Sequence, residues 1–99
     1  MDYYLLIRPE ARADLLDAFH WYQKQKEGLG YDFKSCVDDV LSNILLSPTF
    51  YKLVHLQIRR VFLRKFPFGI FYTLDKNKIV ILAVLHVRRD PLTWKTRSP

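Results

Sequence analysis

Nine basic, aromatic and histidine residues in the second half of the chain have the types and spacing that could carry chemistry. Arginine and lysine contact phosphates, tyrosine and tryptophan stack on bases, and imidazole changes charge near neutral pH and acts as a general acid or base. Such a set could hold a nucleic-acid backbone or contact an acidic protein. Its members are Arg59, Arg60, Arg64, Lys65, Tyr72, His86, Arg88, Arg89 and Trp94.

His86 is the candidate general acid or base, because it ends an apolar run two residues before Arg88. Three successive predicted strands supply Arg60, Tyr72, His86 and Arg88, and we expect these four catalytic candidates to converge at one side of a sheet. The alternative is structural, with Tyr72 in the core and Arg60 on the surface. The remaining members of the set, Arg59, Arg64, Lys65, Arg89 and Trp94, are candidates for binding nucleic acid or a target.

Several kinds of site are excluded by the residues themselves. The chain has no glycine-rich phosphate loop, no serine in a nucleophile elbow and no His, Asp and Glu cluster with metal-ligand spacing. Cys36 is the only cysteine, which excludes an internal disulfide and a thiolate zinc site. We therefore expect no metal and no cofactor.

Charge is distributed unevenly along the sequence. The net charge is +6, but residues 1–50 hold five basic against eight acidic residues, a balance of −3. Residues 51–99 hold eleven basic residues against Asp75 and Asp90, a balance of +9. A field of one sign attracts polyanions or an acidic partner, so the second half is the expected binding half.

The elements that must position these residues follow from periodicity and breakers. Residues 3–7 form a predicted strand, residues from Pro9 to Lys26 a helix, and residues from about Tyr31 to Ser47 a second helix after Gly28 and Gly30. Residues 49–57 form a predicted loop that could begin the next strand. Three apolar runs between Ile58 and Arg88 predict an antiparallel meander, in which alternation places Val80, Leu82, Val84, His86 and Arg88 on one face.

The predicted architecture is a single α+β domain over residues 1–99. It consists of an N-terminal strand, a helical hairpin and a three-stranded antiparallel meander, with the helices packed on one face of the sheet. The sequence starts with too few apolar residues for a signal peptide and holds no apolar run of about 18 residues, so we expect a soluble, cytoplasmic protein without a membrane partner.

The chain resembles the RelE/ParE superfamily of bacterial toxins over nearly its whole length. The helix beginning RPEARADL, the strand FGIFY and the segment IVILAVLHVRRDP carry the resemblance. The resemblance implies an α+β fold, a cognate antitoxin protein as partner, and inhibition of growth through DNA gyrase or through ribosome-bound mRNA.

The resemblance is closer to the ParE-like branch, whose members are described as gyrase inhibitors. Arg60 and Arg88 match two basic positions of the RelE-like nucleases, whereas Phe62, Gly69 and Trp94 stand where those nucleases have a basic residue, an arginine and a tyrosine. Neither phenylalanine nor glycine stabilises phosphate charge. A metal-independent, ribosome-dependent mRNA endonuclease using His86 and arginines is the alternative, and a non-toxic basic binding module is a further one.

Overall fold

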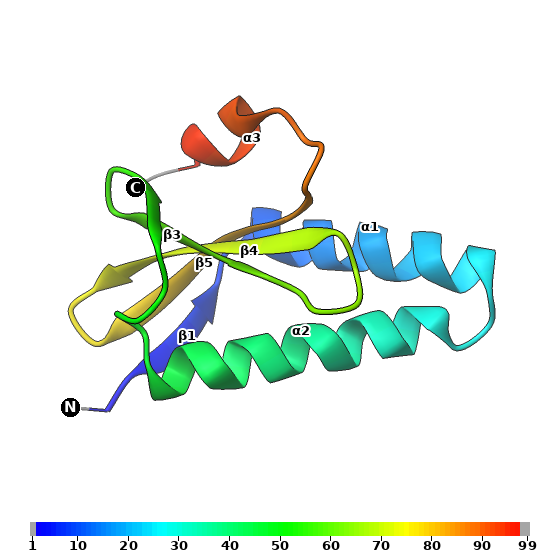
Figure 1. The fold of residues 1–99 in the computed structure, drawn as a ribbon, viewed down its shortest axis with the longest axis horizontal. Coiled ribbons are helices and arrows are strands. Elements are labelled where there is room, and N and C mark those ends of the chain that lie inside the picture. Colours follow the sequence, from blue (N-terminus) through cyan, green and yellow to red (C-terminus); the bar gives the residue numbers. More distant parts are fainter. Residues whose placement is uncertain (1, 98–99) are drawn as a thin grey trace.

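The computed structural model describes residues 2–97 and contains three helices and a mixed sheet of five strands (Figure 1). The elements are β1 (Tyr4–Ile7), α1 (Pro9–Gln25), α2 (Leu29–Leu46), β2 (Leu53–His55), β3 (Ile58–Phe62), β4 (Phe68–Asp75), β5 (Lys78–His86) and α3 (Pro91–Lys95). The α+β class, the N-terminal strand and the helical hairpin are confirmed.

The strand order is β1-β5-β4-β3-β2. β1 pairs in parallel with β5, with Tyr4 opposite Lys78 and Ile7 opposite Ile81, and all other pairs are antiparallel. The prediction of a three-stranded meander was wrong, because β2 forms within the residues expected to be a loop and makes the meander four-stranded.

The turn between α1 and α2 depends on glycine. Gly28 precedes α2 with φ of 89°, in the left-handed region that other residues rarely adopt. A Cβ on Gly30 would lie 2.7 Å from the carbonyl oxygen of Phe19, so only glycine lets the two helices approach this closely. The side chain of Gln23 fixes the same contact by accepting a hydrogen bond of 2.9 Å from the Gly30 N–H.

The main core lies between the helical hairpin and one face of the sheet, which we call the hairpin face. Its completely or almost completely buried members include Phe33 and Ile44 from α2, Ala11 from α1 and Ile70 from β4. As predicted, α1 and α2 therefore pack on one face of the sheet.

A second, smaller core lies on the opposite face of the sheet, which we call the α3 face. It is formed by Ile58, Phe71, Val80, Leu82, Ala83, Leu85 and Trp94. Only Trp94 comes from outside the sheet, and Figure 1 shows α3 across the sheet from α2. The prediction that helices cover one face alone was wrong, because the segment Asp90-Pro91 caps and starts a third helix, with Asp90 Oδ1 accepting from Leu92 N at 3.0 Å.

A β-bulge in β5 changes which face its last residues occupy. Tyr72 lies opposite Ile81 and Phe71 opposite Ala83, so Leu82 is the extra residue. Leu82 and Ala83 consecutively join the α3-face core, and Val84 returns to the hairpin-face core. The predicted alternation was therefore wrong beyond Leu82. In the structure, His86 does not lie on the face of Val80 and Leu82.

Candidate functional site

His86 ends β5 on the hairpin face of the sheet. It pairs in register with Phe68, and the two rings meet edge to face with centroids 5.4 Å apart. Its Nδ1 accepts a hydrogen bond of 3.1 Å from the backbone N–H of Arg88. Because that nitrogen is an acceptor, the proton of the neutral ring lies on Nε2, which is the nitrogen left to contact a ligand.

Arg60 lies on the α3 face, on the other side of the sheet from His86. It pairs with Phe71, and its guanidinium carbon lies 4.4 Å from the ring centroid of Phe62, which is 52% exposed. A Cβ on Gly69 would lie 3.4 Å from the Cγ and Cδ of Arg60. The glycine in β4 therefore leaves room for the half-buried arginine to lie across the neighbouring strand, as one half of a cation–aromatic pair with the exposed Phe62.

Tyr72 is completely buried on the hairpin face. Its hydroxyl donates a hydrogen bond of 2.7 Å to the carbonyl oxygen of Pro48. Arg59 holds the same connection, because its Nη1 donates to the carbonyl oxygens of Thr49 at 3.0 Å and Tyr51 at 2.6 Å. These contacts fix the chain between α2 and β2, so the structure places both residues where they support the fold.

The four catalytic candidates do not converge in the structure. Tyr72 and His86 lie on the hairpin face, with Tyr72 shielded from solvent, while Arg60 lies on the α3 face. Arg88 is exposed in the turn that follows β5. There are two physical reasons. Tyr72 pairs with Arg59, the neighbour of Arg60, so ordinary alternation places it on the other face. The bulge at Leu82 shifts the end of β5 by one residue and separates His86 from the face that holds Arg60.

A different grouping is brought together at one end of the sheet. The backbone N–H of Val87 donates to the carbonyl oxygen of Pro67 at 2.8 Å, so the β3–β4 loop lies beside the segment that follows β5. All four basic candidates on these two segments are exposed, and we call them the basic end: Arg64, Lys65, Arg88 and Arg89. Its arrangement suits an acidic or phosphate-bearing partner.

Trp94 is unavailable for stacking on a base in this structure. It is 6% exposed and lies flat on Phe71, with ring centroids 4.5 Å apart and an interplanar angle of 19°. The ammonium of Lys95 lies 5.7 Å from its centroid. The indole therefore serves as the part of α3 that fills the second core.

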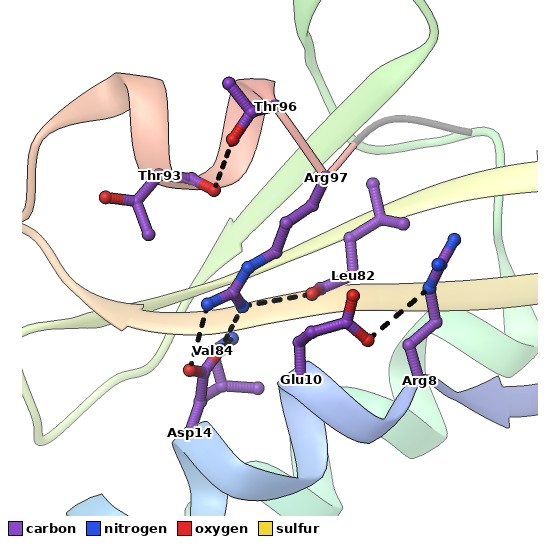
Figure 2. Close-up of polar contacts among 8 residues, drawn as sticks. All are labelled: Arg8, Glu10, Asp14, Leu82, Val84, Thr93, Thr96 and Arg97. Atoms are coloured by element: carbon purple, nitrogen blue, oxygen red, sulfur yellow. Dashed lines mark hydrogen bonds and ion pairs between the residues drawn. The ribbon is translucent and has the colours of Figure 1, made fainter.

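An ion pair between Asp14 and Arg97 was missed by the sequence analysis (Figure 2). Arg97 Nη1 lies 2.6 Å from Asp14 Oδ2, Nη2 lies 3.3 Å from Oδ1, and Nη1 also donates to the carbonyl oxygen of Leu82 at 3.2 Å. Asp14 Oδ2 accepts from the N–H of Val84 at 3.0 Å. Since β1 pairs with β5 only as far as Ile81, these contacts satisfy backbone groups that no strand reaches.

Two clefts border the hairpin. One, of about 440 Å³, runs between α1 and α2 and is lined mainly by apolar side chains, among them Leu15, Leu16, Phe19 and Tyr31. The other, of about 1150 Å³, lies between α2 and the β3–β4 loop and is lined by Asp32 and Asp39 on the helix and by Arg64 and Lys65 on the loop.

Two absences hold for residues 2–97. No three His, Cys, Asp or Glu side chains in this part of the chain are grouped as metal ligands. None of its helices is long and apolar enough to span a membrane.

Burial raises the pKa of Tyr72 from an ordinary 10.0 to about 12, while the nearby Arg59 lowers it and Tyr51 raises it. At a pH between these two pKa values, the Tyr72 hydroxyl is ionised in the unfolded chain and protonated in the folded chain. Stability is therefore constant below pH 10 as far as Tyr72 is concerned. Above that it falls by up to about 1.4 kcal/mol per pH unit. Urea unfolding at pH 9 and pH 11 measures this loss.

The variant Tyr72→Phe is the matched control for this loss. It should cost about 1 kcal/mol at pH 9, because the Pro48 carbonyl loses its donor, and should unfold with a shallower dependence on pH above 10. The residual slope belongs to Tyr22, whose pKa is also raised by burial. An unchanged slope in the variant would show that Tyr72 ionises normally and is not shielded from solvent.

Comparisons with known proteins point to one family. The family model described as "ParE toxin of type II toxin-antitoxin system, parDE" matches residues 5–91. A solved structure described as "Chromosomal ParDE TA system from P. aeruginosa" has a TM-score of 0.76 to this one at 15% sequence identity, over 85% of this chain and 95% of that chain. At that identity the likeness shows the fold alone. No curated protein matches the sequence.

Proposed function

Because the chain belongs to the ParE toxin family of type II toxin–antitoxin systems, we propose that it arrests bacterial growth by acting on DNA gyrase or replication. We further propose that a cognate ParD-type antitoxin neutralises it. The observation that carries the proposal is the family match, which extends from within β1 to the start of α3 and so includes all of the sheet except Tyr4.

The surface of the sheet half supports an acidic partner. Residues 51–99 carry a balance of +9, and the basic end concentrates part of it on two adjacent loops. An antitoxin whose toxin-binding segment is acidic would therefore associate rapidly and bind on this half of the chain.

Two features of the fold suit the addition of a strand or a helix by such an antitoxin. β2 pairs in register with β3 only at Ile58 and Arg59, and the Arg60 N–H donates to Lys52 O at 3.2 Å. Beyond Arg60, β4 still pairs with one edge of β3, but no strand among the described residues pairs with the other edge. An extended peptide could add there. The apolar cleft between α1 and α2 suits the apolar face of an added helix.

The ribosome-dependent mRNA endonuclease is the second candidate, favoured by the half-buried Arg60 against the exposed Phe62, a pair that could hold a phosphate next to a base. It is placed second because Arg60 and His86 lie on opposite faces of the sheet and cannot contact one phosphate together.

Induction of the gene from a repressible promoter is expected to stop growth within a few generations, and co-expression of the neighbouring antitoxin gene should restore it. The purified protein should inhibit supercoiling by gyrase.

In both assays the double variant Arg88→Glu/Arg89→Glu should be at least about tenfold weaker, since charge reversal turns attraction into repulsion. Reversal of two exposed lysines at the C-terminal end of α1, Lys24→Glu/Lys26→Glu, is the matched control.

Three results would redirect the proposal. Discrete new 5′ ends of mRNA that vanish in His86→Ala would establish the endonuclease and overturn the gyrase target. Growth that continues despite soluble, folded protein would favour the non-toxic binding module. Equal loss in the α1 control would mean that net charge matters and the basic end does not.

A further inference from the structure

The α3 face of the sheet is closed by a single short segment, residues 90–97, which we call the cover. The sheet contributes six of the seven buried residues of this core, and the cover contributes Trp94. In Figure 1, α3 lies over the sheet at the end of an exposed connection from β5. The burial of Phe71 and Leu85, at 5% and 3% exposure, depends on a segment that contains only five helical residues.

The cover is attached by two side chains. Among the described residues, every hydrogen bond from residues 90–97 to the rest of the chain comes from Arg97, which donates to Asp14 and to Leu82 O. The other bonds of the cover are internal, such as Thr96 Oγ1 to Leu92 O at 2.8 Å. The second attachment is the stack of Trp94 on Phe71.

We propose that residues 90–97 open and close as a unit, held shut by the Arg97–Asp14 ion pair and the Trp94 stack, and that opening uncovers an apolar binding face. A segment with so few anchors opens at a lower free energy than the central strands. A five-residue helix does not persist alone, so the detached cover gains the entropy of an unfolded chain, which favours opening.

The uncovered face has a defined chemistry. Phe71, Leu82 and Leu85 would form its apolar floor, and Arg60 on Phe62 lies at its border. An apolar peptide segment that carries a carboxylate fits such a face, because the guanidinium of Arg60 would meet the carboxylate. The inference does not rest on the proposed growth inhibition, since its test follows the motion of the cover itself.

Native-state hydrogen exchange tests the opening in the wild-type chain. The amides of Thr93 and Thr96 are hydrogen-bonded within the cover, to Asp90 O at 2.9 Å and Leu92 O at 3.1 Å. After correction for intrinsic rates, we expect them to exchange at least about a hundredfold faster than the buried amides of β4, and without the denaturant dependence of global unfolding. They should still be protected relative to a free peptide.

The variant Arg97→Gln tests the ion pair. It should speed exchange at Thr93 and Thr96 by at least about tenfold, since a charge-assisted pair contributes more than a neutral hydrogen bond. The β4 amides, which exchange through global unfolding, should still exchange more slowly than these two. In a Trp21→Phe background, the fluorescence of Trp94 should become more accessible to acrylamide. Arg12→Gln, which removes an exposed arginine of α1, is the matched control.

Each contrary outcome overturns the inference. Exchange at Thr93 and Thr96 with the protection and denaturant dependence of β4 would make the cover an integral part of the fold. Exchange at the rate of a free peptide would mean that it is never closed. Equal effects of Arg97→Gln and Arg12→Gln would remove the ion pair from the mechanism.

Discussion

Asp14→Ala is expected to lower the free energy of unfolding by about 3 kcal/mol, near the lower end of the range for removing one partner of a buried ion pair. The side chains of Asp14 and Arg97 are 11% and 18% exposed, so neither charge is well solvated. The substitution leaves the guanidinium of Arg97 without its carboxylate and the N–H of Val84 without its acceptor. Urea unfolding followed by far-UV circular dichroism measures the loss.

Two variants separate the charge of Asp14 from its hydrogen bond. Asp14→Asn keeps an oxygen for the N–H of Val84 and removes the charge, so it should lose about half as much as Asp14→Ala. Asp17→Ala removes an exposed carboxylate from the same helix and should change stability by no more than about 0.5 kcal/mol. A loss of that small size in Asp14→Ala would contradict the account of the ion pair.

The position of Asp14 explains why this ion pair could not be read from the sequence. Asp14 lies in the acidic first half of α1, where it is indistinguishable from Asp17 by composition or spacing. Its partner lies 83 residues away. The requirement for the pair arises from tertiary structure, because β1 ends at Ile7 and leaves backbone groups of β5 to be satisfied.

The elements themselves were predictable where a strong local signal exists. Pro9 and Gly28 mark where the helices begin, and the apolar residues of α2 form its buried side. Gly30 was expected to precede the second helix but lies inside α2, which begins at Leu29. β2 escaped prediction because a three-residue edge strand has no room for an alternating pattern. The bulge at Leu82 escaped because both its residues are apolar and both are buried, so the sequence shows no break in the pattern.

The bulge that interrupts the predicted alternation also separates two of the candidate catalytic residues, Arg60 and His86. His86 and Arg60 were expected to share a face only because regular pleating was assumed through nine residues of β5. The binding candidates Arg64, Lys65 and Arg89 and the catalytic candidate Arg88 are exposed in the structure, since loops next to strand ends are normally solvated. Arg59 was a binding candidate and Tyr72 a catalytic candidate with the core as its alternative, but both side chains donate hydrogen bonds to backbone carbonyl groups between α2 and β2, a use that their residue types do not reveal.

Trp94→Ala is expected to lower the free energy of unfolding by about 3–5 kcal/mol, the range for removing a large aromatic side chain from a core. The indole is the only contribution of the cover to the second core, and its stack on Phe71 adds to the area that it buries. Trp94→Phe keeps a ring on Phe71 and should lose about half as much or less. Trp21→Ala, at a site that is 56% exposed, is the control and should be nearly neutral.

If the cover opens as a unit, Trp94→Ala cannot lower the free energy of unfolding by more than the free energy that holds the cover closed. The decrease in the free energy of unfolding in the double variant Asp14→Ala/Trp94→Ala should then be smaller than the sum of the decreases in the two single variants, because either change already favours the open state. An additive result would mean that the ion pair and the stack act independently. Growth assays on Trp94 variants have to be compared with Trp94→Phe, since a toxin that loses its second core loses activity for reasons unrelated to contact with a target.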